Sequence, residues 1–202
     1  MKALVAALSV VVFLSGCASK TKSPPVDTAT ATASATAVAP SPTATPCAVA
    51  GASTQTEQSN AGADKQALLR DISFTASACP RVVFEFENAP PSYVVEYRNP
   101  PFSNCGSGAR VDTSGWGATA YLVFHSNSAS GVDLSGPTFR QTYKKSKDIA
   151  PGSVILRRVY ETCDFEGTLE WIVALDARHS FKVSTLTAPP RLVIDVSAVP
   201  AA

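Results

Sequence analysis

Apolar and polar residues alternate along most of the C-terminal two thirds of the chain. Val82, Phe84 and Phe86, for example, fall on one side of an extended segment, with Val83 and Glu85 on the other. The same period of two predicts strands at 81–87, 93–98, 119–125, 153–160, 169–175, 181–185 and 192–196. Turns rich in Pro and Gly separate them, and only residues 64–71 could form a short helix. This pattern predicts an all-β fold, a single β-sandwich or barrel.

The first residues have the organisation of an export signal. Lys2 precedes an apolar run over residues 3–14, shorter than the roughly 20 residues that a membrane-spanning helix needs. The Leu-Ser-Gly-Cys sequence ending at Cys17 resembles the bacterial lipobox, in which signal peptidase II cuts before a cysteine whose thiol carries a diacylglycerol. We therefore expect a lipoprotein signal peptide over residues 1–16 and lipid attachment at Cys17. The alternative is an ordinary secretory signal with a chance cysteine.

Residues 17–66 have the composition of a flexible tether. Ala, Ser, Thr and Pro supply 24 of the 29 residues from 18 to 46, and no aromatic residue occurs between Leu14 and Ser73. Such a segment buries too little apolar surface to offset its ordering entropy, so we expect it to be disordered. The folded domain is then residues 67–202, held at the outer face of the cell membrane by the lipid anchor.

The charge balance argues against nucleic acid as a partner. The chain has 17 basic and 16 acidic side chains, so it offers no positive field to a phosphate backbone. It contains no phosphate-binding glycine loop, zinc-protease helix or hydrolase nucleophile elbow. The two histidines, His125 and His179, have no partner at metal-ligand spacing. We therefore expect neither a cofactor nor a metal ion.

Besides the expected lipid-bearing cysteine, the chain has an even number of cysteines, which favours disulfides in an exported protein. They are Cys47, Cys79, Cys105 and Cys163. If the strands on either side of Pro90 form a hairpin, Cys79 and Cys105 emerge at the same end of it. This predicts the pair Cys79–Cys105 and, by elimination, Cys47–Cys163. Free or mixed thiols and a metal site are the alternatives, although no C-x-x-C spacing favours zinc.

Two polar clusters could carry chemistry. The acidic cluster consists of Glu161, Asp164, Glu166 and Glu170. Paired carboxylates at the right separation hydrolyse glycans by general acid–base catalysis, and carboxylates also bind calcium. The plainer interpretation is that Asp164 and Glu166 decorate a turn at Gly167. The basic cluster consists of Lys144, Lys145 and Lys147 beside Phe139 and Tyr143, and is either a solvated loop or a contact for an acidic wall polymer.

Four segments together resemble the AMIN-like domain of actinobacterial lipoproteins. They are RVVFEF at 81–86, VVEY at 94–97, LRRVYETCDFEG at 156–167 and FKVSTLTAPPRLVIDV at 181–196. The resemblance covers about 75–197, and its most specific part is PPRLVIDV. It implies a β-sandwich related to the AMIN domain, a non-catalytic module that localises cell-wall amidases and secretin complexes and is associated with peptidoglycan binding. Cys105 and Cys163 depart from the family pattern, and a bridge particular to this subgroup would explain both.

The sequence therefore favours an exported lipoprotein whose β-sandwich binds peptidoglycan or an envelope protein. Aromatic and Arg side chains are common in binding surfaces, although such aromatic residues fit core or loop packing equally well. The candidate contacts are Tyr97, Arg98, Trp116 and Arg157. One alternative is a small envelope hydrolase that uses Asp164 and Glu166. Another is a structural or assembly lipoprotein with no polymer ligand.

Overall fold

The alternating segments form β-strands in the computed structural model, which describes residues 46–201. The strands are β1 (Glu57–Ser59), β2 (Ala67–Thr75), β3 (Arg81–Phe86), β4 (Tyr93–Tyr97), β5 (Ala120–Ser126), β6 (Ala129–Ser130), β7 (Val132–Asp133), β8 (Arg140–Gln141), β9 (Asp148–Ile149), β10 (Leu156–Phe165), β11 (Thr168–Leu175), β12 (His179–Thr187) and β13 (Pro190–Pro200). One 3-10 turn, η1 (Ser114–Trp116), precedes β5. No helix among the described residues is long and apolar enough to cross a membrane. The expected signal peptide, Cys17 and the first part of the tether lie outside the described residues.

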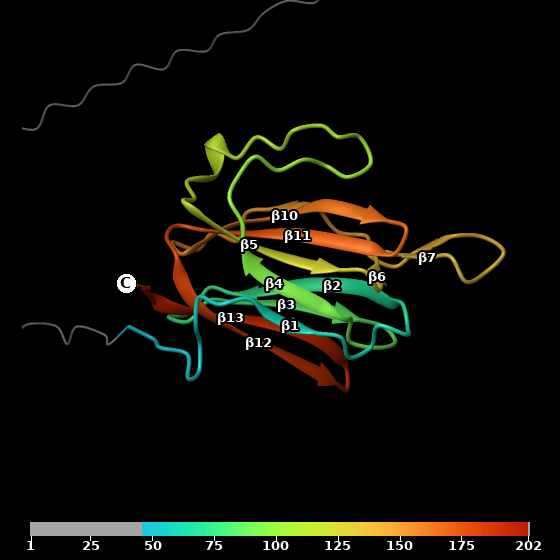
Figure 1. The fold of residues 1–202 in the computed structure, drawn as a ribbon, viewed down its shortest axis with the longest axis horizontal. Helices are drawn as coiled ribbons and strands as arrows, with labels where there is room; N and C mark the ends of the chain where they lie inside the picture. The colour runs from blue at the N-terminus through green and yellow to red at the C-terminus, as the bar shows by residue number, and fades with distance from the viewer. Residues whose placement is uncertain (1–45, 202) are drawn as a thin grey trace, which may run out of the picture. The chain divides into compact units, whose positions relative to one another are not determined.

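Two large sheets form the two layers of a sandwich (Figure 1). One sheet has the order β1-β4-β5-β11-β10-β9 and the other the order β12-β13-β3-β2-β6, while β7 and β8 form a small separate hairpin. Neighbouring strands are antiparallel except for β2 and β6. The predicted all-β sandwich is thus confirmed, and each of the seven predicted strands is present.

The space between the sheets is filled by aromatic and branched side chains from both of them. Phe84 on β3 lies 4.8 Å from Phe124 on β5 and 6.1 Å from Trp171 on β11, measured between ring centroids. All three side chains are completely buried. The period-two pattern of β3 reflects this arrangement, since Val82, Phe84 and Phe86 face the core and the intervening residues face outward.

A second apolar cluster covers the outer face of the six-stranded sheet. Residues 98–119, between β4 and β5, loop over this face (Figure 1, top) and bring Phe102 and Val111 against Tyr121, Val123 and Ile172. Strands β5 and β11 are therefore buried on both faces, which explains their nearly continuous apolar sequences. Residues 98–119 thus form an outer loop over this sheet.

The expected hairpin between β3 and β4 does not form. Strand β3 belongs to the five-stranded sheet and β4 to the six-stranded sheet, so residues 87–92 cross from one layer to the other. Asn88 fixes the start of this crossing, because its side-chain amide donates to the carbonyl of Gln66 and its Oδ1 accepts from the amide of Leu68. Pro91 is buried in the crossing instead of forming the exposed tip of a turn.

The disulfide pairing predicted from that hairpin is consequently wrong. The structure contains Cys47–Cys79 and Cys105–Cys163 in place of Cys79–Cys105 and Cys47–Cys163. Because the chain changes sheets after β3, the outer loop carries Cys105 over to β10, where Cys163 lies. Cys79 remains beside the five-stranded sheet, where the carbonyl of Cys47 accepts a hydrogen bond from the amide of Ala198 in β13.

The folded unit begins earlier than expected, because residues 46–66 are part of the sandwich and not of the tether. Ser53 pairs with Phe181 at the edge of β12, and β1 then pairs with β4 in the other sheet. This segment, the N-terminal strap (residues 46–59), joins the two layers along one side. Its alternation is weak because its side chains are small and polar, so its order comes from backbone pairing and from the Cys47–Cys79 disulfide.

The residues suggested as a short helix, 64–71, mostly form the start of β2. Ala67, Leu68 and Leu69 are all buried, and the register between β2 and β3 shifts between Leu69 and Asp71. A β-bulge at this point interrupts the alternation of sides. The strand therefore lacked a clear period of two in its sequence.

Candidate functional site

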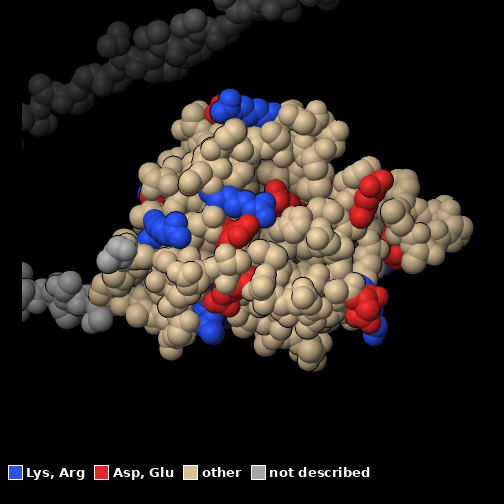
Figure 2. Space-filling model, in the orientation of Figure 1, with Lys and Arg blue, Asp and Glu red and all other residues tan. Residues whose placement is uncertain are grey.

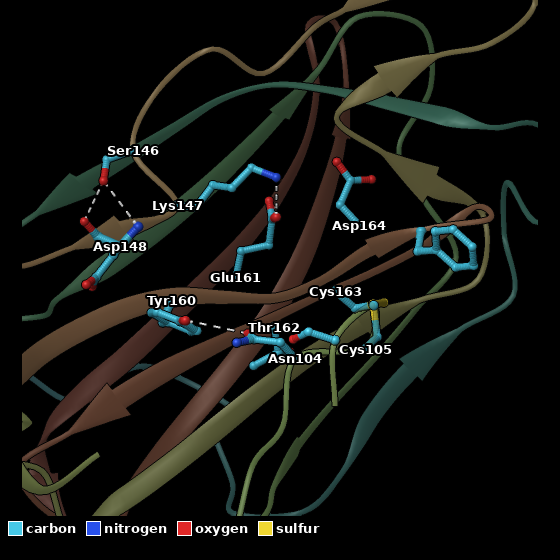
Figure 3. Close-up of a pocket in the computed structure, with 13 residues that line it drawn as sticks. Asn104, Cys105, Ser146, Lys147, Asp148, Tyr160, Glu161, Thr162, Cys163 and Asp164 are labelled. Carbon is cyan, nitrogen blue, oxygen red and sulfur yellow. Dashed lines mark hydrogen bonds and ion pairs between the residues drawn. A yellow bond between two sulfur atoms is a disulfide. The ribbon is translucent and has the colours of Figure 1, made fainter. Parts of the chain in front are cut away.

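A groove runs along the free part of β10. It has a volume of about 600 Å³ and lies between the outer loop and residues 146–148 (Figure 3). Its lining consists of Asn104, Cys105, Gly106, Ser107, Ser146, Lys147, Asp148, Tyr160, Glu161, Thr162, Cys163, Asp164 and Phe165. We refer to it as the β10 groove.

An irregularity in β10 shapes the floor of the groove. The register between β10 and β11 shifts between Glu161 and Cys163, so Thr162 leaves the regular ladder. Its carbonyl instead accepts a 2.9 Å hydrogen bond from the amide of Cys105, and its Oγ1 donates to Glu170 Oε1 at 2.7 Å. Such bulges bend a strand and redirect its side chains. Here the bulge turns β10 toward the outer loop.

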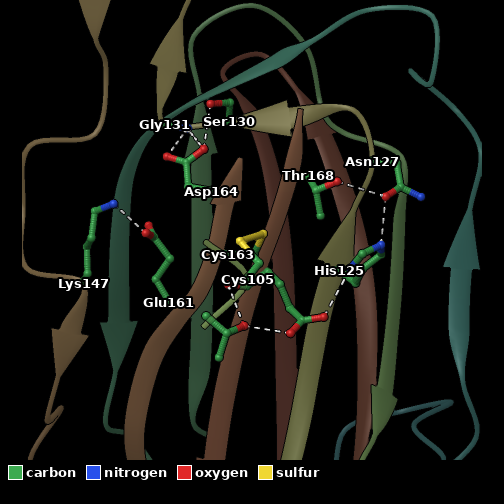
Figure 4. Close-up of a disulfide and its surroundings, with 12 residues drawn as sticks. Cys105, His125, Asn127, Ser130, Gly131, Lys147, Glu161, Cys163, Asp164 and Thr168 are labelled. Atoms are coloured by element: carbon green, nitrogen blue, oxygen red, sulfur yellow. Dashed lines mark hydrogen bonds and ion pairs between the residues drawn. A yellow bond between two sulfur atoms is a disulfide. The ribbon is translucent and has the colours of Figure 1, made fainter. Parts of the chain in front are cut away.

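The Cys105–Cys163 disulfide fixes one wall of the groove (Figure 4). Residues 104–109 form a tight turn, in which the amide of Asn104 donates to the carbonyl of Ala109 at 2.9 Å. The amide of Gly108 donates to the carbonyl of Asn104 at 2.8 Å. Because the disulfide joins this turn to the strand, the wall cannot swing away from β10.

The opposite wall is held from the core. The ring of Tyr143 lies edge-on to Trp171, with 5.6 Å between centroids, and its hydroxyl donates to the carbonyl of Ser146 at 2.7 Å. Burial raises the pKa of Tyr143 to about 12, so the hydroxyl keeps its proton at neutral pH. Thr142 adds a 2.6 Å hydrogen bond from its Oγ1 to the carbonyl of Leu69. These contacts place Lys147 over the groove.

Glu161 and Lys147 form an ion pair inside the groove. The Lys147 Nζ lies 2.6 Å from Glu161 Oε1, and the carboxylate side chain is only 7% exposed while the lysine is 52% exposed. Burial raises the pKa of Glu161 above its ordinary value; Lys147 opposes this rise, and the negative charge of Asp164 adds to it. The groove thus presents a positive group at its mouth and a buried carboxylate beneath it.

Asp164 is committed to a structural role. Its carboxylate accepts hydrogen bonds from Ser130 Oγ at 2.7 Å and from the amide of Gly131 at 3.1–3.2 Å (Figure 4). Glu166 is exposed in the turn after β10, with a left-handed φ of 50°. Of the two carboxylates of the hydrolase alternative, Glu166 lies in an exposed turn, as the turn interpretation expected, whereas Asp164 lies within β10 with its oxygens bonded to Ser130 and Gly131. Glu170 contacts Thr162 through Oε1, and its Oε2 pairs with Arg98 and His125.

Tyr97 lies away from the groove and joins the two sheets. Its hydroxyl donates to the carbonyl of His179 at 2.6 Å and accepts from the amide of His179 at 3.0 Å. Its ring is edge-on to Phe181, and the guanidinium of Arg178 lies 4.4 Å above the ring. These contacts fit the packing interpretation of Tyr97.

The other three candidate contacts do not line the groove either. Arg98 pairs with Glu96 and Glu170. Trp116 is half-buried in the outer loop, with 5.5 Å between its ring centroid and that of Tyr160. Arg157 lies in β10, where the register with β11 shifts. Trp116 thus packs against one residue of the groove lining, Tyr160.

Sequence reasoning singled out some groove residues without bringing them together. Lys147 was part of the basic cluster and Glu161 part of the acidic one, but nothing in the sequence placed one above the other. Asn104 and Tyr160 had no distinguishing pattern. The departure of Cys105 and Cys163 from the family pattern was the usable signal, since the bridge that would explain both joins the outer loop to β10.

Charged side chains are distributed in neighbouring pairs of opposite sign over the face shown in Figure 2, with no continuous field of one sign. Arg81 pairs with Asp195 and Arg191 with Glu85 on the outer face of the five-stranded sheet. The face in Figure 2 therefore offers no single-sign field for the long-range attraction of a charged ligand.

The comparisons with known proteins give one match. The family model described as the AMIN-like domain matches residues 67–198. No curated protein and no solved structure matches the chain. The match begins at the first residue of β2 and ends within β13, and the N-terminal strap lies before its first residue.

Proposed function

Because the chain belongs to the AMIN-like domain family, we propose that it is a non-catalytic module of the cell envelope that binds peptidoglycan through the β10 groove. AMIN-like domains are generally non-enzymatic, extracytoplasmic binding modules. The two disulfides fit an exported protein, since such bonds persist in oxidising compartments.

The shape and chemistry of the β10 groove carry this proposal. An open groove lined by hydroxyl, amide and charged groups, with Tyr160 beside them, offers donors and acceptors to a polymer of sugars and short peptides. Lys147 is placed to meet a carboxylate of such a polymer, and backbone groups of residues 104–107 are held rigid by the disulfide. A preorganised wall reduces the ordering cost of binding.

A lipid anchor at Cys17 completes the proposal. The Leu-Ser-Gly-Cys sequence supports it, and the tether would let the domain reach the wall from the membrane surface. Metabolic labelling with a palmitate analogue tests it: the wild-type chain should carry label in the membrane fraction, and Cys17→Ala should not. Equal labelling of both chains would refute the anchor.

Co-sedimentation with purified peptidoglycan sacculi tests the binding. The protein spans residues 18–202, which include the whole described fold and both disulfides, and is measured at low and at physiological salt. We expect saturable pelleting at both. Pelleting that disappears at physiological salt would indicate weak charge attraction only and would contradict specific recognition.

Two matched lysine variants locate the site. Lys147→Ala removes the charge at the mouth of the groove and should weaken binding by about tenfold, as expected for one charge-assisted hydrogen bond. Lys182→Ala removes an equally charged, exposed side chain on β12 and should leave binding unchanged. Equal affinity of the two variants would show that the groove is not the site.

A second surface favours an envelope protein as the partner. The β7–β8 hairpin projects from the sandwich (Figure 1, right), and its tip carries Leu134, 65% exposed, and Phe139, 74% exposed. Large apolar groups exposed together commonly mark protein contacts. If the wild-type protein does not pellet with sacculi at either salt, this hairpin is the surface on which to seek a partner, and Phe139→Ser should abolish that contact.

A further inference from the structure

Strand β12 forms an unusually open edge of the sandwich. Among the described residues, the other outermost strands of the two large sheets are β1, β6 and β9, which have three, two and two residues. Strand β12 has nine residues and is outermost in its sheet (Figure 1, bottom). Proteins usually protect long edges with charges, prolines or a covering segment, because an open edge pairs with other strands.

The N-terminal strap protects only the first part of this edge. Ser53 and Phe181 exchange backbone hydrogen bonds of 2.8 and 3.0 Å. The backbone groups of Phe181 therefore point away from β13, and by the alternation of a strand so do those of Val183, Thr185 and Thr187. Within the described part of the chain these three residues have no backbone partner on that side.

We propose that β12 pairs with β12 of a second copy of this chain, antiparallel and about a two-fold axis at Thr185. In this register Thr185 faces its own copy, and Val183 faces Thr187 of the partner subunit. Each such pair exchanges two backbone hydrogen bonds. The two five-stranded sheets then become one continuous sheet across the dimer.

The shape of the free edge favours a second copy over an unrelated strand. It is closed at one end by the strap at Phe181 and at the other by the turn at Ala188 and Pro189, so residues 183–187 are symmetric about Thr185. An antiparallel copy has the same length and the same ends. A C2 interface requires this kind of self-complementary patch.

Side chains along the edge are compatible with this pairing. Residues 183–187 carry no charge, and the nearest charged residue, Lys182, falls opposite Ala188 of the partner subunit and not opposite its own copy. Thr–Thr pairs are favourable across antiparallel strands. Leu186, which is 46% exposed, lies opposite Ser184 of the partner subunit and loses exposed apolar area on pairing.

Cysteine cross-linking tests the register directly. In residues 18–202 of the wild-type protein all cysteines are in disulfides, so Thr185→Cys adds the only free thiol. Opposite residues in a hydrogen-bonded antiparallel pair have Cα atoms about 5.5 Å apart, within the range of a disulfide. Mild oxidation should therefore give a covalent dimer, seen on a non-reducing gel.

Ser184→Cys is the matched control, on the same strand and also at an exposed position. In the proposed register its own copy lies diagonally, at about 7–8 Å or more, which is too far for an unstrained disulfide. It should give little covalent dimer. Similar yields from both variants, or none from Thr185→Cys, would contradict the proposed register.

Sedimentation equilibrium measures the association without a cross-link. The wild-type protein should show a reversible monomer–dimer equilibrium, and Thr185→Lys should weaken the dimer by about tenfold or more by placing two like charges at the axis. Ser73→Lys makes the same charge change on an exposed position of β2 and should not. A wild-type protein that stays monomeric at the highest soluble concentration overturns the proposal, whatever the outcome of the sacculus experiment.

Discussion

Removal of the Cys105–Cys163 disulfide should destabilise the domain and open the β10 groove at the same time. The bond closes a loop with a sequence separation of 58 residues, for which the chain-entropy relation gives about 4 kcal/mol of the free energy of unfolding. The double variant Cys105→Ala/Cys163→Ala also frees the turn at 104–109, which covers one end of the groove. Binding to sacculi should fall together with stability.

The second disulfide supplies a matched control. Cys47–Cys79 closes a separation of 32 residues, which gives slightly less, about 3.7 kcal/mol. Cys47→Ala/Cys79→Ala should therefore lose similar stability in urea unfolding, but it should keep its affinity for sacculi because neither cysteine lines the groove. Equal binding by both folded double variants, or a cost below about 1 kcal/mol for loss of Cys105–Cys163, would contradict the role given to this disulfide.

Three further changes have defined consequences. Because the pKa of Glu161 is raised in the folded state, protonation of this carboxyl favours the folded protein. This contribution to the free energy of unfolding is full below the ordinary glutamate pKa and is lost as pH rises through the folded value. Urea unfolding between about pH 4 and 7 should show this decline in the wild-type protein and a smaller one in Glu161→Gln. Tyr143→Phe removes the hydrogen bond to Ser146 and should cost about 1 kcal/mol in the same assay, and an unchanged stability would show that this bond does not hold the groove wall. Phe84→Ala empties the centre of the core and should cost about 3–5 kcal/mol, with a cost below 1 kcal/mol contradicting its central position.

Local alternation was enough to locate the strands but not to assign them to sheets. The alternation of Val82, Phe84 and Phe86 follows from one buried face, and a strand in either sheet of a sandwich would show the same alternation. Whether β3 continues into a hairpin or crosses to the other layer depends on Asn88, whose side chain binds the backbone near Gln66. That contact joins residues about twenty positions apart and leaves no trace in the pattern.

The same limit explains the parts of the fold that the sequence did not reveal. In β2 the bulge after Leu69 removes the period of two, and in the N-terminal strap Ser53 is joined to β12 by backbone bonds to Phe181. The compositional signature of a disordered tether therefore continued past the point where the folded chain begins. Composition describes what side chains can bury, whereas an edge strand can be added through its backbone alone.

The candidate site was visible only in pieces. Lys147 and Glu161 belong to charge clusters in the sequence, but their ion pair depends on the position of Tyr143 in the core. Tyr97, by contrast, looked like a binding residue, since an aromatic side chain in a strand gives the same sequence signal whether it faces a ligand or packs against Phe181. Only the placement of β4 against β12 distinguishes a binding role of Tyr97 from a packing role.

The most direct test of the account is an NMR titration of the ¹⁵N-labelled protein, residues 18–202, with soluble peptidoglycan fragments. Binding in the β10 groove should give saturable shifts of amide signals that are confined to its two walls and floor, including Cys105, Lys147 and Thr162. Signals from the outer face of the five-stranded sheet, such as Val83 and Val193, should not move. Shifts centred on the β7–β8 hairpin, or no shifts at all, would contradict the β10 groove as a peptidoglycan-binding site.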